Sequence, residues 1–235
     1  MRHCLQRNTD LVAVVIGASL ILFLLAVKRG ISFDYFVIDT FALGKVPPYA
    51  GLVSNAGVGC WVAGGVIALF SSLVLLRTGV RTETVLCLRT AGLFSLWLGM
   101  DDFFMLHDWL LPRLLPVRER DIILLNVAVG IVFLVRYHRA LWDTRREAVL
   151  LSGVLFALSV VLDFVHDVRG LEMEALLGRS FAYLLEDGSK FLGICLWGYF
   201  LIRESASQVL RYLRACPVCL TGAGRGERLE RVSVS

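Results

Sequence analysis

The chain has 235 residues, of which 57% are hydrophobic and 19% charged, and its mean hydropathy is +0.72. Soluble domains have roughly 45 to 50% apolar and about 25% charged residues, so this composition excludes an ordinary soluble domain and indicates an integral membrane protein. The net charge of +4 comes mainly from arginines in the connectors and the tail, which is typical of a topology signal. We therefore expect no nucleic-acid partner.

The first apolar segments predict two transmembrane helices. Residues 11–27 follow a short basic start and lack a small-residue cleavage site, so they resemble an uncleaved anchor more than a signal peptide. Pro47 and Pro48 interrupt the next connector, and residues 52–76 form the second predicted helix. Small residues let neighbouring backbones approach, so this helix is expected to pack closely through its glycines, Gly57, Gly59, Gly64 and Gly65.

The third predicted helix runs from Thr84 to Leu111, where Pro112 stops it. A short fourth helix covers residues 122–135, and the fifth covers 148–165. The fifth ends in the sequence DFVHD, residues 163–167.

A polar link over residues 168–174 leads to the sixth helix, 175–202. The predicted fold is thus all-α, a polytopic membrane bundle of about six transmembrane helices. Residues 1–204 form this membrane domain, and residues 205–235 form a basic, partly disordered cytoplasmic tail.

Basic residues predict the orientation. With six spans both termini lie on one side, and the segments on that side hold 15 basic residues against 8 in the segments on the other side. Because cytoplasmic connectors carry the excess of Lys and Arg, both termini are expected in the cytoplasm. The motif Cys216-Pro-Val-Cys219 in the tail is interpreted as two reduced thiols, with a zinc site shared with His3 and Cys4 as the alternative.

The charged residues inside apolar segments point to a site. Asp101, Asp102, His107 and Asp108 end the third predicted helix, although a charged side chain at a helix centre costs about 2.5 to 3.5 kcal/mol on the insertion scale. The third and fifth helices run outward and the sixth runs inward. The polar groups of these three helices are therefore predicted to lie at one depth, near the outer leaflet. On the fifth and sixth helices these groups are Asp163, His166, Asp167, Arg179, Glu186, Asp187 and Lys190.

Carboxylates and histidines on separate helices favour a divalent metal, namely zinc, manganese or iron. The predicted metal ligands are Asp101, His107, Asp108, Asp163, His166 and Asp167. Five residues are predicted to be catalytic: an uncoordinated acid serves as general base, and a cation stabilises developing negative charge. They are Asp102, Glu186, Asp187, Lys190 and Arg179. A purely structural alternative for Glu186 and Lys190 is an ion pair within one helix.

These features lead to a hypothesis of a metal-dependent hydrolase or transferase that takes a small amphiphilic, lipid-like substrate from the surrounding membrane lipids. Proton- or cation-coupled transport is the alternative, because buried ionisable residues also mark ion pathways. A non-catalytic sensor or scaffold is the third. Clustering of the acids at one depth favours the enzyme, because a pathway would need polar residues continuing through the bundle.

Overall fold

A computed structural model describes residues 44–47, 49–142, 146–177 and 179–215, and it describes the backbone alone for residues 142, 166–177 and 179–183. The chain divides into two compact units, Met1–Leu52 and Val53–Ser235, with the boundary at the start of the first described long helix. The predicted helix over residues 11–27 and the tail cysteines lie outside the described residues.

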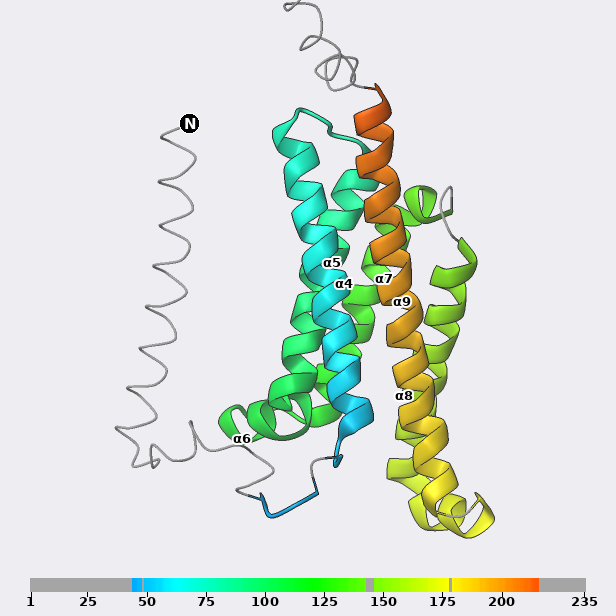
Figure 1. Cartoon of the computed structure of the whole chain (residues 1–235). Coiled ribbons are helices and arrows are strands. Elements are labelled where there is room, and N and C mark those ends of the chain that lie inside the picture. The colour runs from blue at the N-terminus through cyan, green and yellow to red at the C-terminus, as the bar shows by residue number, and fades with distance from the viewer. Residues whose placement is uncertain (1–43, 48, 143–145, 178, 216–235) are drawn as a thin grey trace, which may run out of the picture. The chain divides into compact units, whose positions relative to one another are not determined.

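Every described secondary-structure element of the second unit is a helix, which confirms the all-α prediction. In chain order these elements are α4 (Leu52–Arg77), α5 (Glu83–Phe104), the π-helix η1 (Leu106–Leu110), α6 (Leu111–Leu114), α7 (Glu119–Trp142), α8 (Arg146–Leu177) and α9 (Arg179–Ala215). The long helices alternate in direction along the chain (Figure 1).

Three of the described helices are long and apolar enough to cross a membrane: Leu52–Arg77, Glu119–Leu141 and Arg146–Val165. Large apolar side chains such as Phe70, Val132 and Val135 are well exposed on these helices, as expected for a surface that faces lipid. The structure is therefore compatible with a membrane protein. The count of six spans and the cytoplasmic position of both termini stay predictions.

Two predicted boundaries were wrong. The helix expected over residues 122–135 is the longer α7, which bends at Tyr137 (φ −111°, ψ 16°). The link expected over residues 168–174 is helical, because α8 continues to Leu177. Its Leu, Glu and Met residues are good helix formers, so the loss of apolar character there does not end the helix. At the other end of the unit, α9 runs beyond residue 204 to Ala215.

The two ends of α5 have different causes. At the start, the Thr82 hydroxyl accepts a hydrogen bond from the Val85 backbone N–H (3.2 Å) and caps the helix. At the end, Met105 adopts a left-handed conformation (φ 50°, ψ 47°) that stops the helix after Phe104. The prediction of one continuous helix to Leu111 was therefore wrong, since no Gly or Pro in the sequence marks this break.

Glycines bring α4 close to its neighbours, which confirms the predicted packing role for three of the four glycines, Gly57, Gly64 and Gly65, but not for Gly59. A Cβ on Gly65 would lie 3.0 Å from the Gly92 carbonyl oxygen of α5, and one on Gly64 would lie 3.1 Å from the Gly198 Cα of α9. Gly57 is similarly placed, 3.3 Å from a methyl group of Ile194. In contrast, no atom lies within 4 Å of such a Cβ on Gly59.

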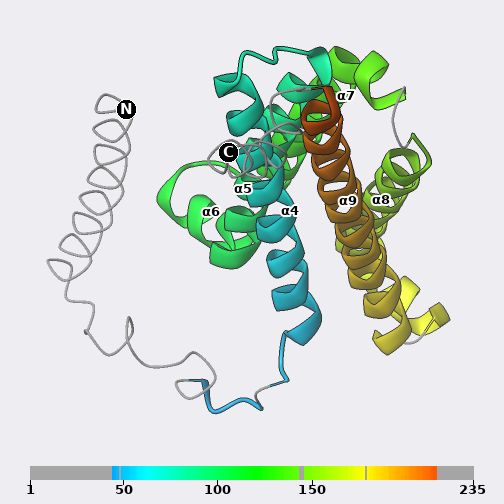
Figure 2. The ribbon, with the colours of Figure 1, turned by 45° about the horizontal axis from the view of Figure 1, so that its top comes forward.

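The helix ends that carry the charged residues lie at one end of the unit. α8 and α9 run side by side in both views, joined at their lower ends in Figure 1 (Figure 1, Figure 2). The end of α5, η1, α6 and the start of α7 lie at this same end (Figure 1). The fold therefore gathers charged segments that are far apart in the sequence.

Candidate functional site

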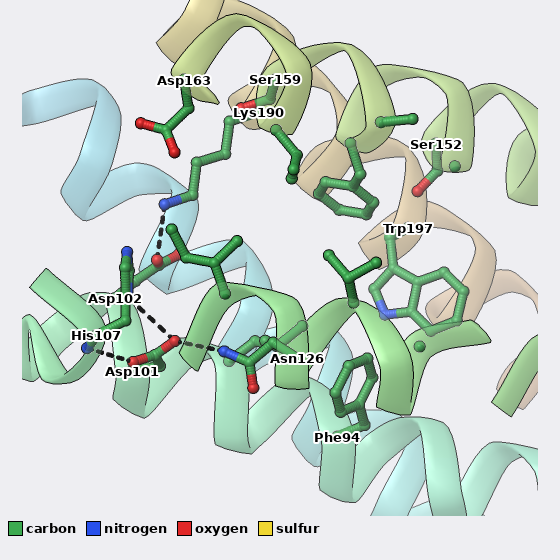
Figure 3. A pocket seen from close by; sticks show the side chains of 18 of the residues that line it. Phe94, Asp101, Asp102, His107, Asn126, Ser152, Ser159, Asp163, Lys190 and Trp197 are labelled. Carbon is green, nitrogen blue, oxygen red and sulfur yellow. Dashed lines mark hydrogen bonds and ion pairs between the residues drawn. The ribbon is translucent and has the colours of Figure 1, made fainter. Parts of the chain in front are cut away.

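A cavity of about 630 Å³ lies between α4, α5, η1, α7, α8 and α9. Its polar lining consists mainly of charged residues and one amide, namely Asp101, Asp102, His107, Asp108, Glu119, Asn126, Asp163, Glu186, Asp187 and Lys190. Aromatic and aliphatic side chains form the rest of the wall, among them Phe94, Phe133, Val149, Phe156 and Trp197. Figure 3 shows Asp163 and Lys190 across the cavity from Asp101 and His107. The cavity therefore has a charged end and an apolar body.

Asp101 is the most deeply buried carboxylate of this lining, with 3% of its surface exposed. Its Oδ1 accepts a hydrogen bond from the His107 backbone N–H (2.9 Å), and its Oδ2 accepts one from the Asn126 amide (2.9 Å). Trp97 fixes Asn126 in turn, because its indole N–H donates to Asn126 Oδ1 (3.0 Å). These contacts satisfy a buried charge and join the end of α5 to α7.

The left-handed Met105 creates this arrangement. A non-glycine residue in this conformation costs about 1 to 2 kcal/mol. The left-handed residue turns the chain so that the His107 backbone N–H can donate to Asp101 Oδ1. The π-helix η1 follows directly. Local strain and π-helical turns are both frequent at functional sites.

His107 lies between two carboxylates. Its Nδ1 is 3.1 Å from Asp101 Oδ2, and its Nε2 is 2.9 Å from Asp108 Oδ1. Burial alone lowers the pKa of His107, but its hydrogen bonds to both carboxylates outweigh burial and raise the pKa to about 10. The bond to His107 also lowers the pKa of Asp108, although burial acts in the opposite direction. In this arrangement His107 is a cation that holds two acids.

Asp102 connects three helices. Its Oδ1 accepts a hydrogen bond from Lys190 Nζ of α9 (2.8 Å), and its Oδ2 accepts one from the indole N–H of Trp61 of α4 (3.0 Å). The Lys190 side chain reaches across the cavity to make this contact (Figure 3). Lys190 therefore forms its ion pair with Asp102 of α5 and not with an acid on its own helix, α9.

Negative charge exceeds positive charge in the cavity. The described lining contains seven carboxylates, from Asp101, Asp102, Asp108, Glu119, Asp163, Glu186 and Asp187, but only two cations, Lys190 and protonated His107. The side chains of Asp108 and Glu119 are neighbours at this end of the cavity. Acidic side chains therefore outnumber basic ones in the described lining, and a ligand that brings positive charge would complement them.

The structure brings together most of the residues that the sequence analysis selected. Eight of them line the cavity: Asp101, Asp102, His107, Asp108, Asp163, Glu186, Asp187 and Lys190. The side chains of His166, Asp167 and Arg179 lie outside the described residues. The sequence analysis did not include Glu119 and Asn126, which face the site from α7. Glu119 could have been selected from the sequence because it lies in the acidic first turn of α7, the long helix that follows the charged segment 101–108.

The predicted metal ligands do not form a recognisable metal site in the described part of the chain. Within it, no group of three or more His, Cys, Asp or Glu side chains is arranged to hold a metal ion. His107 Nε2 lies 2.9 Å from Asp108 Oδ1, while the buried Nδ1 lies 3.1 Å from Asp101 Oδ2 without an aligned hydrogen bond among the described residues. The divalent metal stays a prediction, and the carboxylates are the groups best suited to it.

Comparison with known proteins places the chain in a family. No curated protein and no solved structure matches it. A family model described as a domain of unknown function (DUF8692) matches residues 11–203, which include every residue of the described cavity lining. The chain therefore belongs to the DUF8692 family.

Proposed function

We propose that the chain is an integral membrane enzyme that binds a lipid-like amphiphile in the cavity and hydrolyses it or transfers a part of it. The two-part lining of the cavity is the observation that carries this proposal. A charged end next to an apolar wall matches a molecule with a polar head and an apolar chain. The volume of about 630 Å³ is within the usual range for small-molecule sites.

The charge of the cavity supports a cation at the head of the ligand. A divalent cation, zinc, manganese or iron, would bind carboxylates of this lining and polarise the bond that is cleaved. An amphiphile whose head is itself cationic would satisfy the same charge. Asp108 and Glu119 are neighbouring carboxylates, and a pair of this kind is suited to general acid–base chemistry.

Lys190 has a separate role in this proposal. Its amine is held at the charged end by Asp102, where it can stabilise negative charge that develops on the substrate. Trp61 fixes the other oxygen of Asp102, so the position of the pair is set by two helices. The lysine is therefore preorganised for this role.

The purified protein in mild detergent provides the test, with mass spectrometry of bound lipids and elemental analysis on one sample. We expect a bound amphiphile, a lower amount of it in Asp163→Asn and Asp108→Asn, and the wild-type amount in the control Glu147→Gln. Glu147 is exposed near the start of α8 and does not line the cavity. Equal amounts in all four proteins, or none in any, would refute the proposal.

Turnover separates an enzyme from a binding protein. Incubation with a membrane lipid extract is expected to yield a product with wild type but not with Lys190→Met. Loss of turnover after chelation, with recovery on adding zinc, manganese or iron, would support the metal. Activity that resists chelation in a metal-free sample would refute the metal while leaving an enzyme with a cationic substrate.

Transport is a second candidate because one carboxylate is buried far from the charged end of the cavity. Glu204 on α9 is 3% exposed, and its Oε1 accepts a hydrogen bond from the Gln208 amide (2.6 Å). It lies 14 residues beyond Lys190, or about 21 Å along the helix axis. In proteoliposomes, proton-coupled uptake that is lost in Glu204→Gln without any product would favour transport over the enzyme.

A further inference from the structure

Ser152 is a buried polar group in the apolar body of the cavity. It lies on α8 with 1% of its surface exposed, and it belongs to the cavity lining. Its hydroxyl has no hydrogen-bond partner among the described residues. Figure 3 shows this hydroxyl directed inward, on the side of Trp197. A hydroxyl buried without a partner is unfavourable by about 1 to 3 kcal/mol, so a partner supplied by a ligand would relieve that cost.

The neighbouring groups do not supply that partner. The Trp197 indole N–H already donates to the Ser95 hydroxyl (2.8 Å), which in turn donates to the Ala91 carbonyl (2.8 Å). Next to Ser152, Gly153 also lines the cavity, and no atom lies within 4 Å of a Cβ built on it. Gly153 is exposed, so there is room for a ligand atom next to this position of α8.

The distance between Ser152 and the charged end of the cavity determines how long a ligand must be to reach both. Asp163 follows Ser152 by 11 residues on the same helix, which corresponds to about 16 Å along the axis. The wall near Ser152 includes Val149 and Phe156, which offer no hydrogen bond to a ligand. Ser159 is the polar lining residue of α8 between Ser152 and Asp163. A ligand that spans both ends therefore needs an extended, mainly apolar chain between them.

We infer that Ser152 and the space beside Gly153 form a second polar subsite, which binds an oxygen atom on the chain of the amphiphile about 16 Å from its head. The ligand class is then an amphiphile with a cationic or metal-bound head and a hydroxyl, carbonyl or ester group deep in its chain. A plain hydrocarbon chain would leave the Ser152 hydroxyl unpaired. This inference rests on the proposed amphiphile binding and specifies its substrate class.

Two probes that differ by one hydroxyl test the subsite. One is octadecylamine, and the other is the same amine with a hydroxyl about 13 bonds from the nitrogen, at about 1.2 Å per bond of extended chain. Binding to the full chain in nanodiscs can be followed by tryptophan fluorescence, because Trp61 and Trp197 line the cavity. Wild type is expected to bind the hydroxylated amine about 2- to 12-fold more tightly, the range for one net hydrogen bond.

Variants separate the subsite from the rest of the cavity. Ser152→Ala is expected to abolish the preference while keeping wild-type affinity for octadecylamine, and Ser72→Ala is expected to keep the preference. Ser72 is a matched control because it is a fully buried serine outside the cavity lining. Gly153→Leu fills the open space, so it should weaken both probes but not an amine of about ten carbons, which is too short to reach it.

Each outcome decides one of the two proposals. Equal affinity of wild type for both probes, or a preference that persists in Ser152→Ala, would overturn the subsite while amphiphile binding stands. Equal affinity is also the result expected if an ordered water satisfies the hydroxyl permanently. Failure of both probes to bind, or binding that Asp163→Asn leaves unchanged, would overturn amphiphile binding and the subsite with it.

Discussion

Asp102→Asn tests how strongly the site holds the bundle together. The substitution leaves an acceptor for the Trp61 indole but removes the negative charge that pairs with Lys190 at 2.8 Å. The side chain of Asp102 is 12% exposed and that of Lys190 is 41% exposed, so the pair lies between a surface pair and a buried one. Surface pairs contribute about 0 to 1 kcal/mol, whereas breaking a buried pair costs about 3 to 5 kcal/mol. We expect a loss of about 1 to 2 kcal/mol in the free energy of unfolding.

A double-mutant cycle isolates this interaction. Unfolding in mixed micelles with increasing denaturing detergent would be followed by tryptophan fluorescence for wild type, Asp102→Asn, Lys190→Met and the double variant. If the pair is coupled, the double variant is less destabilised than the sum of the single variants, by about 1 kcal/mol. Additive effects of the two substitutions would show that Asp102 and Lys190 do not interact, and the arrangement of α5 against α9 at the site would be wrong.

Two further predictions concern packing and pH. Gly92→Ala should lower the free energy of unfolding by about 1 to 3 kcal/mol, because its Cβ would lie 2.8 Å from the Gly65 carbonyl oxygen. The control Gly59→Ala meets no atom within 4 Å and should be neutral or stabilising. Equal melting temperatures of the two variants would contradict the contact between α4 and α5. His107 has a pKa raised from 6.5 to about 10, so its contribution to stability is complete below pH 6.5 and is lost as the pH rises towards 10. His107→Gln should flatten thermal stability over this interval, and a curve that stays parallel to that of wild type would refute the pairing of His107.

The sequence was sufficient to predict which helix ends carry the site. Alternating helices reverse direction at each connector, so polar residues at the end of one helix and the start of the next fall at the same depth. Asp101, Asp163 and Asp187 illustrate this, because they come from three helices and line one cavity. The packing role of Gly64 and Gly65 could also be predicted, since small residues in an apolar helix have few other uses.

Several features could not be predicted because they depend on tertiary contacts. Met105 is an ordinary helix former, and its left-handed conformation is maintained by the return of His107 to Asp101. Helical spacing therefore cannot be counted across this break to relate Asp101 to Asp108. Similarly, nothing in the local sequence distinguishes a Lys190 paired within α9 from one paired with Asp102 on α5.

The continuation of α8 beyond residue 165 shows a different limit. Hydropathy predicts where a helix leaves the apolar layer, but a helix can continue into a polar environment when its residues favour the conformation. For the same reason hydropathy gave too short a segment for α7. Burial of Glu204 was missed because one acid in a charged stretch gives no signal until its neighbours in space are known.

Photo-crosslinking tests the central claim, binding of an amphiphile inside the bundle, most directly. Octadecylamine with a photoreactive group at the end of its chain would be activated in nanodiscs, and the labelled residues would be found by peptide mass spectrometry. We predict labels on cavity-lining residues of several helices, such as Phe94 of α5 and Phe156 of α8, which excess unlabelled amine removes. Labels confined to exposed residues such as Phe70 and Val132, unaffected by competitor, would contradict the account.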